Sequence, residues 1–128
     1  MFDLINKKCV PHEKMVALKQ EEIKEYLSQL KDWEFLPARR SFSEGGETNL
    51  PMLRASEGQS KITKEYKFKD FKDAMEFVNK VSVTAEKEGH HPDIEIHYNK
   101  VNIILWTHFV KGLSENDFII AAKIDNIL

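Results

Sequence analysis

The chain has 128 residues, 41% hydrophobic and 31% charged, a balance typical of a folded globular protein and not of a disordered segment. Its 19 lysines and arginines nearly offset its 21 aspartates and glutamates, so we expect no direct binding of nucleic acid and no attraction to a membrane surface. The apolar runs are far shorter than the roughly 20 residues that span a bilayer. With a single cysteine, Cys9, and no recognisable signal sequence, we predict a cytoplasmic protein.

The first half of the chain contains one amphipathic helix and one short strand. Residues 1–17 show little periodicity and are interpreted as an arm that carries no chemistry. From Leu18, apolar residues spaced i, i+3, i+4 and i+7 predict a helix of about 11 residues. Residues 33–35 are predicted to form a short strand. Residues 37–60, rich in glycine, proline and polar residues, are predicted to be a long loop, with a hairpin or a mobile flap as alternatives.

The second half of the chain has clearer periodicity. Residues 61–68 alternate apolar and polar side chains, as a half-buried strand does. Asp70 is placed to cap a long helix, and Gly89 and Pro92 are stop signals just beyond its end. The core face of this helix is predicted to hold Phe71, Ala74, Met75, Val78, Val81 and Ala85. Two alternating runs on either side of residues 99–100 then predict a tight hairpin.

The last predicted element is a helix that begins with a variant of the capping box. Ser114 is the expected N-cap, and Asp117 follows three residues later, where Glu or Gln is usual. Its core face is expected to carry Ile120, Ala121, Ile124 and Leu128. The complete order of elements predicts one α+β domain over residues 1–128, a four-stranded antiparallel sheet with three helices packed on one face.

Two adjacent histidines follow the end of the long helix. The negative end of a helix favours imidazolium, so His90 or His91 could hold a proton near neutral pH and donate it to a leaving hydroxyl. Glu86 lies one turn before His90 and could orient it or stabilise its charge. Polar residues that simply cap the helix end would explain the same pair equally well.

A third histidine is expected to join them through the hairpin. His108 follows the second hairpin strand. Antiparallel pairing that sets Tyr98 opposite Val101 also sets His91 opposite His108 when the register is continued outward. Taken alone, His108 could be a hydrogen-bonded histidine at a sheet edge. Its spacing from the other two nevertheless predicts one cluster of three histidines.

A metal site is the obvious competitor for this cluster. His90, His91, His108 and Glu86 could supply three or four ligands, but adjacent histidines of an extended chain point in different directions. The sequence also lacks paired cysteines and His-x-x-x-His spacing, so we predict no metal. A nucleophilic pair of Cys9 with a histidine has weaker support still. No glycine-rich phosphate loop or dinucleotide fingerprint occurs.

The combined spacing of these residues resembles that of one protein family. The matching segments are Glu86-Lys87-x-x-His90-His91-Pro92-Asp93, Tyr98-Asn99-Lys100-Val101, Thr107-His108 and Gly112-Leu113-Ser114-x-x-Asp117. With Trp33 and the Phe68-x-Asp70-Phe71 start of the long helix, they make the chain from about Leu18 onward similar to the pterin-4a-carbinolamine dehydratases. That family also includes a dimerisation cofactor of a homeodomain transcription factor.

The resemblance implies a hydro-lyase that needs neither metal nor organic cofactor. Such an enzyme removes water from a 4a-hydroxytetrahydropterin to give quinonoid dihydropterin, which recycles the cofactor of aromatic amino acid hydroxylases. The match assigns pterin binding and general acid/base catalysis to the three histidines, with His90 or His91 as acid and His108 as its partner. Four further residues match pocket or supporting positions: Glu86, Pro92, Trp33 and Asp117.

The resemblance also implies a homodimer or homotetramer and a functional link to a hydroxylase. Two alternatives remain: a non-catalytic binding or regulatory protein on the same fold, and an enzyme of another pterin pathway such as molybdenum-cofactor metabolism. Retention of all three histidines favours the dehydratase. The chain departs from the family in the length of residues 37–60 and in Val110-Lys111-Gly112, which stands where many members have a glycine pair.

Overall fold

The computed structural model describes residues 4–37 and 60–128. Four strands form one antiparallel sheet in the order β1-β2-β4-β3. The strands are β1 (Glu34–Leu36), β2 (Lys61–Lys67), β3 (Asp93–His97) and β4 (Lys100–Leu105). The α-helices are α1 (Gln20–Leu27), α2 (Phe71–Glu88) and α3 (Glu115–Asp125), and the short 3-10 turns are η1 (Leu4–Asn6), η2 (His12–Lys14) and η4 (His108–Val110). The predicted α+β architecture is confirmed.

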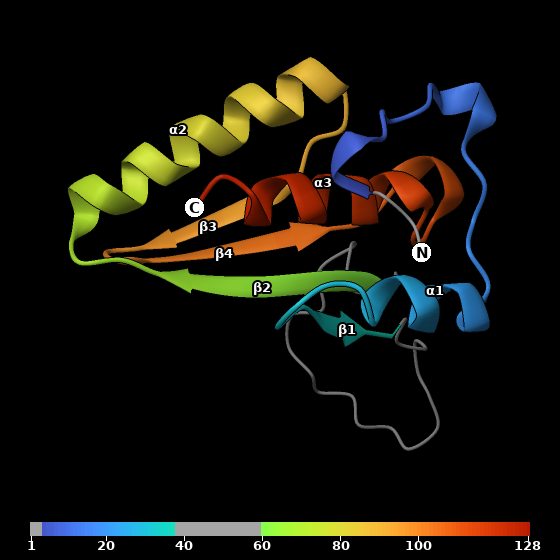
Figure 1. The fold of residues 1–128 in the computed structure, drawn as a ribbon, viewed down its shortest axis with the longest axis horizontal. Helices are drawn as coiled ribbons and strands as arrows, with labels where there is room; N and C mark the ends of the chain where they lie inside the picture. The colour runs from blue at the N-terminus through green and yellow to red at the C-terminus, as the bar shows by residue number, and fades with distance from the viewer. Residues whose placement is uncertain (1–3, 38–59) are drawn as a thin grey trace, which may run out of the picture.

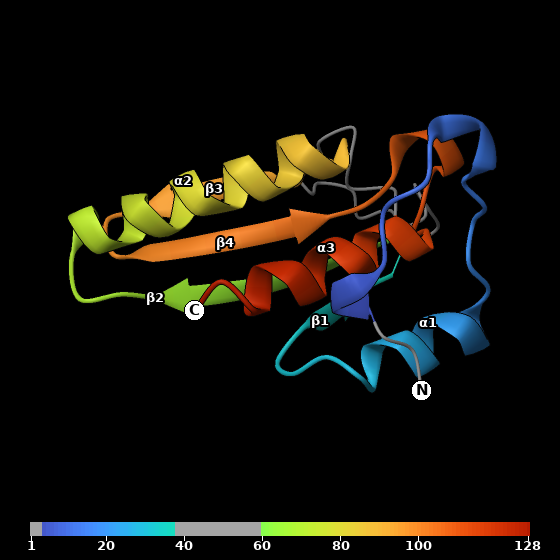
Figure 2. The same ribbon diagram turned by 45° about the horizontal axis from the view of Figure 1, so that its top comes forward.

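The helices cover one face of this sheet. Figures 1 and 2 show α2 and α3 lying next to each other against the sheet, with the N-terminal segment crossing the start of α3. No helix in residues 4–37 or 60–128 has the length and apolar character needed to cross a membrane.

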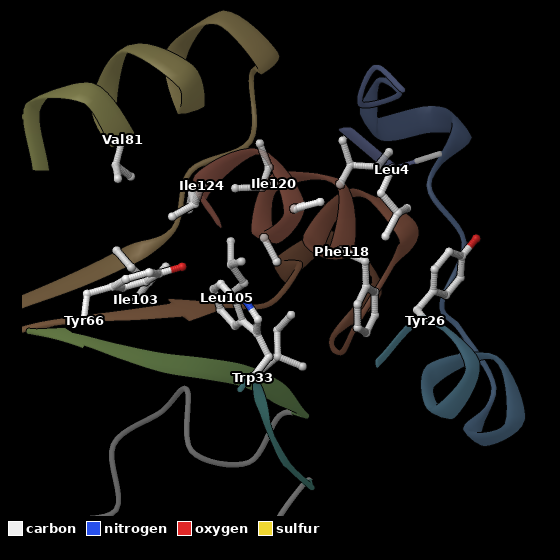
Figure 3. Close-up of a cluster of buried hydrophobic side chains, with 14 of the residues drawn as sticks. Leu4, Tyr26, Trp33, Tyr66, Val81, Ile103, Leu105, Phe118, Ile120 and Ile124 are labelled. Atoms are coloured by element: carbon white, nitrogen blue, oxygen red, sulfur yellow. The ribbon is translucent and has the colours of Figure 1, made fainter. Parts of the chain in front are cut away.

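The core lies between the inner face of the sheet and α3. Alternate residues of the two central strands point inward and are buried: Ile62, Tyr66, Val101, Ile103 and Leu105. From α3, Phe118, Ile120 and Ile124 pack onto them and are fully buried (Figure 3). Helix α3 is enclosed on nearly all sides, because α1 and the N-terminal segment cover the face turned away from the sheet.

The ends of α2 follow the signals in the sequence. The Asp70 carboxylate accepts a hydrogen bond from the Asp73 N–H at 3.0 Å, and Gly89 ends the helix with φ of 70°. The predicted apolar face is wrong at Phe71, which is 49% exposed, while Phe77 is buried. Phe77 takes the inward position because its ring packs against those of Tyr66 and Phe68, at centroid distances of 4.6 and 5.0 Å.

The hairpin between β3 and β4 forms, but its predicted register is wrong by two residues. His97 pairs with Lys100, so the turn consists of Tyr98 and Asn99 instead of residues 99–100. The Asn99 side-chain amide donates to the Phe68 carbonyl at 3.0 Å, and the Asn99 backbone carbonyl accepts from the Phe68 N–H at 2.8 Å. These bonds hold Asn99 against the end of β2, and Tyr98 adopts the positive φ of 56°. A shift of two residues leaves every side chain on its predicted face.

Several smaller expectations also need correction. Helix α1 has 8 residues instead of about 11, and Trp33 precedes β1 instead of starting it. Leu128 is exposed, since α3 ends at Asp125 and no longer directs it to the core. The loop predicted for residues 37–60 lies, except for its two end residues, outside the described part of the chain.

The packing of α3 predicts the cost of truncating its largest core side chain. Phe118 is fully buried and stacks on Tyr26 with ring centroids 5.2 Å apart. Phe118→Ala should lower the free energy of unfolding by about 3–5 kcal/mol through lost burial and a residual cavity. Chemical denaturation measures this loss. The same substitution at exposed Phe71 is the control, and equal losses in the two variants would contradict the assignment of Phe118 to the core.

Candidate active site

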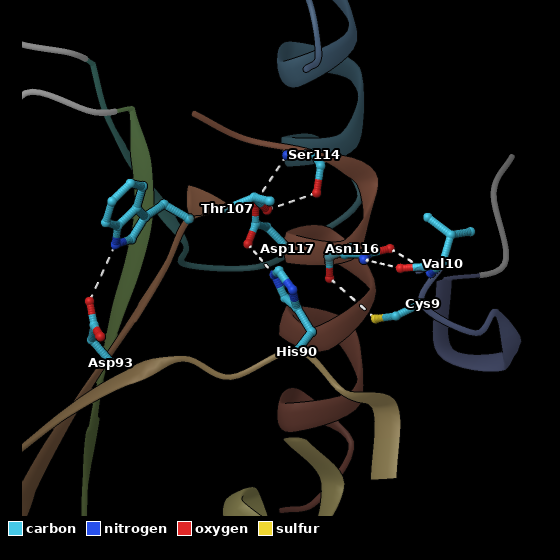
Figure 4. Close-up of polar contacts among 9 residues, drawn as sticks. Cys9, Val10, His90, Asp93, Thr107, Ser114, Asn116 and Asp117 are labelled. Carbon is cyan, nitrogen blue, oxygen red and sulfur yellow. Dashed lines mark hydrogen bonds and ion pairs between the residues drawn. The ribbon is translucent and has the colours of Figure 1, made fainter. Parts of the chain in front are cut away.

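His90 turns inward directly after α2 because Gly89 adopts a left-handed conformation. Its side chain is only 7% exposed, and its Nε2 lies 2.7 Å from Oδ1 of Asp117 on the first turn of α3 (Figure 4). An ionised carboxylate can only accept hydrogen bonds, so Nε2 is the nitrogen that carries hydrogen. The contact joins the end of α2 to the beginning of α3.

Asp117 is completely buried, yet both of its carboxylate oxygens have partners. Oδ2 accepts from the Thr107 hydroxyl at 2.7 Å and from the Ser114 backbone N–H at 3.0 Å. The Thr107 and Ser114 hydroxyls also lie 2.8 Å apart. Asp117 therefore caps α3 and holds His90 at the same time. A buried carboxylate is tolerated where hydrogen bonds replace its hydration, and here they come from three separate segments.

His91 points the other way, toward solvent. Its Nε2 lies 3.0 Å from Oε1 of Glu86, and both side chains are well exposed, at 62% and 83%. The prediction that Glu86 orients His90 is therefore wrong. The left-handed Gly89 takes His90 off the face of α2 on which Glu86 lies and leaves His91 within its reach. An exposed pair of this kind adds little stability, so its geometry is easily rearranged.

The ring of His108 packs against the ring of Trp106. His108 lies in η4, and its ring centroid is 3.8 Å from that of Trp106 at an interplanar angle of 34°. Trp106 Nε1 donates to Oδ2 of Asp93 at 3.3 Å (Figure 4). The observed strand register, extended outward, falls on His91 and Trp106 and not on His91 and His108. The predicted register that places His91 opposite His108 is therefore wrong by two residues, and Trp106 joins the two segments through its contacts with His108 and Asp93.

Trp33 lies in a different part of the molecule. Its indole Nε1 donates to Oδ2 of Asp125 at 3.0 Å, and its ring meets Tyr66 edge-on with centroids 6.5 Å apart. Asp125 follows Asp117 by eight residues, which is roughly 12 Å along a helix axis. Trp33 is thus a core residue at the far end of α3. Pro92 is half-buried and connects His91 to β3.

The segment between β4 and α3 carries a further feature of the site. Thr107 and Gly112 form a β-bridge, with N–H to carbonyl bonds of 2.7 and 3.3 Å in the two directions. Within the loop, Lys111 has φ of 54°, a conformation that glycine adopts far more readily. Lys111 is therefore left-handed in the segment where this sequence departs from the resembled family.

The structure bears on two other chemistries, a metal site and a nucleophilic Cys9. Within residues 4–37 and 60–128, no three His, Cys, Asp or Glu side chains are grouped closely enough to hold a metal ion. Cys9 Sγ contacts the Asn116 carbonyl oxygen at 3.9 Å. Burial, with the nearby Glu88 carboxylate, raises the pKa of the Cys9 thiol to about 12. Such a thiol is almost entirely protonated at neutral pH and is a poor nucleophile.

Sequence reasoning did not assign roles to Thr107, Trp106 or Asp93. Thr107 and Asp93 lie within the motif segments, but their partners depend on how three separate segments pack. Trp106 continues the apolar run of β4 and is 9% exposed, so its sequence context indicates only a core residue. A hydrogen bond of its indole to an acidic residue cannot be seen from the local pattern.

Comparisons with known proteins show the family of the chain. The family model described as pterin 4 alpha carbinolamine dehydratase matches residues 16–127. A candidate pterin-4-alpha-carbinolamine dehydratase from Alkaliphilus metalliredigens is 38% identical over 98% of this chain and 96% of its own length. Another from Nitrosospira multiformis is 41% identical over 98% of this chain and 92% of its own length.

One solved structure is similar over most of the chain. It is the crystal structure of a transcriptional coactivator/pterin dehydratase from Brucella melitensis. The TM-score is 0.66 at 29% identity, and the match covers 88% of this chain and 98% of the other.

Removing the buried carboxylate should be costly. Asp117→Ala leaves the His90 ring, the Thr107 hydroxyl and the Ser114 N–H without their acceptor. We expect the free energy of unfolding to fall by about 3–5 kcal/mol, as when one partner of a buried network is deleted. Urea denaturation followed by circular dichroism measures the loss.

Asp73 offers a matched control for this substitution. It occupies the same third position of a helix, in α2, but it is only partly buried. Asp73→Ala should cost less than about 1 kcal/mol, the usual size of a favourable charge near a helix start. Similar losses in both variants would mean that Asp117 acts only as a helix-terminal charge.

Proposed function

Because the chain belongs to the pterin 4 alpha carbinolamine dehydratase family, we propose that it is a hydro-lyase that dehydrates a 4a-hydroxytetrahydropterin to quinonoid dihydropterin. The observation that carries the proposal is the hydrogen-bonded network of His90, Asp117 and Thr107, because it joins the two segments on which His91 and His108 lie. His90 is held by Asp117, while His91 and His108 are exposed on the segments that flank β3 and β4.

The proposed reaction requires two proton transfers and no change of oxidation state. The bond between C4a and the hydroxyl oxygen breaks, and an imidazolium donates a proton to that oxygen so that it leaves as water. A neutral imidazole takes the proton of the neighbouring ring nitrogen, whose electrons form the new C=N bond. Each turnover thus moves one proton from the protein and one to it. Histidines suit both tasks because an imidazole gains and loses protons near neutral pH.

The exposures of the three histidines suggest how these tasks are divided. His91 and His108 are open to solvent and can approach a bound pterin, so we assign the acid and base roles to them. His90 is nearly buried and its Nε2 is occupied by Asp117. We propose that His90 binds or orients the substrate through the rest of its ring. Glu86 would hold His91, and Pro92 would fix the direction in which the chain leaves it.

The substrate class suggests a cellular context. Hydroxylation of aromatic amino acids generates 4a-hydroxytetrahydropterins, so we propose a functional link to such a hydroxylase. We further propose that the chain acts as a single domain, works without metal or organic cofactor, and assembles into homodimers or homotetramers, as the family resemblance implies.

Dehydration of a chemically prepared 4a-hydroxytetrahydropterin tests the proposed activity. The intact protein should accelerate the reaction above the buffer rate, and His91→Ala or His108→Ala should lower kcat by about 10²–10⁴-fold, the usual contribution of a positioned acid or base. Stopped-flow absorbance follows the loss of the carbinolamine. His97→Ala is the control, because His97 is an exposed histidine on β3 paired only loosely with Glu95 at 3.8 Å.

The outcome separates the dehydratase from the regulatory alternative. Acceleration that survives in both histidine variants would reject the histidine mechanism. No acceleration by the intact protein would reject the dehydratase and favour a binding role. That role is in keeping with the similar Brucella melitensis protein, which is described as a transcriptional coactivator/pterin dehydratase.

A further inference from the structure

We propose that the N-terminal arm is part of the catalytic apparatus, because it positions the pair formed by His90 and Asp117. The device is a clasp of four residues: Cys9 and Val10 of the arm, Glu88 of α2 and Asn116 of α3. This inference rests on the proposed function. It assigns a positioning role to a segment that lies before residue 16, where the match to the family model begins.

The first half of the clasp fastens the arm to α3. The Val10 N–H donates to Oδ1 of Asn116 at 3.0 Å, and Nδ2 of Asn116 donates to the Val10 carbonyl at 3.0 Å (Figure 4). The Asn116 side-chain amide thus forms the same pair of hydrogen bonds with Val10 that a neighbouring β-strand would form. Asn116 is 1% exposed, and burial of an amide is tolerated only where both of its polar atoms have partners.

The second half fastens the arm to α2. The Cys9 N–H donates to Oε1 of Glu88 at 3.0 Å, and the other carboxylate oxygen of Glu88 lies 3.3 Å from Nζ of Lys123 on α3. Burial alone would raise the pKa of Glu88, but the Cys9 N–H and the Lys123 ammonium outweigh it and hold that pKa below its ordinary value. Glu88 is therefore charged at neutral pH and bridges the arm, α2 and α3.

The clasp acts at the two places that determine the distance between His90 and Asp117. Glu88 lies two residues before His90, and Asn116 immediately precedes Asp117. Cys9 and Val10 are adjacent, so two successive backbone N–H groups of the arm link the end of α2 to the start of α3. Hydrogen bonds weaken steeply once their angle falls well below linear. Small movements between the two helix ends would consequently loosen the 2.7 Å contact of His90 with Asp117.

Other contacts keep the arm on this path. Leu4 is buried in the core, Lys7 forms an ion pair with Glu115, and the Leu18 N–H donates to the Leu113 carbonyl at 2.9 Å. Each of these anchors lies near the start of α3 or packs over it. The arm was expected to carry no chemistry, yet its contacts converge on the turn that bears Asp117.

The proposal is tested in the full-length protein with Asn116→Ala and Val10→Pro. Asn116→Ala removes the side-chain amide. Val10→Pro leaves Asn116 in place but removes the backbone N–H of residue 10, which donates to the Asn116 side chain. In each variant we expect kcat for carbinolamine dehydration to fall about 10-fold and KM to stay within about two-fold. The substrate would still bind, but His90 would be held less well. Val16→Pro, the same change at an exposed arm position outside the clasp, is the matched control.

Two readouts that do not depend on activity accompany the kinetics. In ¹H–¹⁵N spectra of the histidine side chains, the His90 ring N–H bonded to Asp117 should be protected from solvent exchange in the wild type and in Val16→Pro. It should exchange freely in the two clasp variants. Alkylation of Cys9 by iodoacetamide at pH 8 should be at least about 10-fold faster in the clasp variants, since release of the arm exposes the thiol and lowers its pKa toward the ordinary value.

The outcomes separate this inference from the proposed function. Clasp variants with wild-type kcat and an unchanged His90 signal would overturn the positioning role, even if Cys9 alkylation shows that the arm is released. A wild-type protein without dehydratase activity would reject the proposed function, and the His90 signal alone would then decide whether the clasp positions the pair. If Asn116→Ala fails to fold, Val10→Pro carries the test, because it changes only the half-buried arm.

Discussion

The buried carboxylate of Asp117 is the constraint on which the rest of the site depends. A charge with no solvent access must be surrounded by donors, and this one takes them from His90, Thr107 and Ser114. Those residues come from the end of α2, the end of β4 and the cap of α3. One carboxylate therefore fixes the mutual positions of three elements, and any rearrangement of them leaves a buried charge poorly solvated.

The first turn of α3 concentrates the polar contacts of the fold. Ser114 meets Thr107, Glu115 meets Tyr26 and Lys7, Asn116 meets the arm, and Asp117 meets His90. The rest of α3 is almost wholly apolar and buried. Hydrophobic contacts have little direction and would allow the helix to slide or rotate within the core. The directional hydrogen bonds of the first turn fix the position and rotation of α3, and one of them is made to His90.

The far end of α3 has its own polar contacts, of a different character. There Asp125 accepts from Trp33, Tyr66 and Lys64. Burial and the hydrogen bond to Asp125 raise the pKa of Tyr66, so its hydroxyl stays protonated and remains a donor. No histidine takes part among these residues. The two ends of α3 therefore have different partners. Asp125 joins one end to β2 and to Trp33, and the first turn at the other end contributes to the candidate active site.

The sequence by itself determined the order of the helices and strands and the faces of the strands. Hydrophobic periodicity, Asp70, Gly89 and the capping pair of Ser114 with Asp117 are local signals, and they specified α2, α3 and the hairpin. Tertiary structure decided which atoms meet. Asn99 binds β2 and shifts the hairpin by two residues, Gly89 turns His90 toward Asp117 and leaves His91 to Glu86, and the arm docks on Asn116. These pairings join residues from different elements, and their geometry depends on packing that no local pattern encodes.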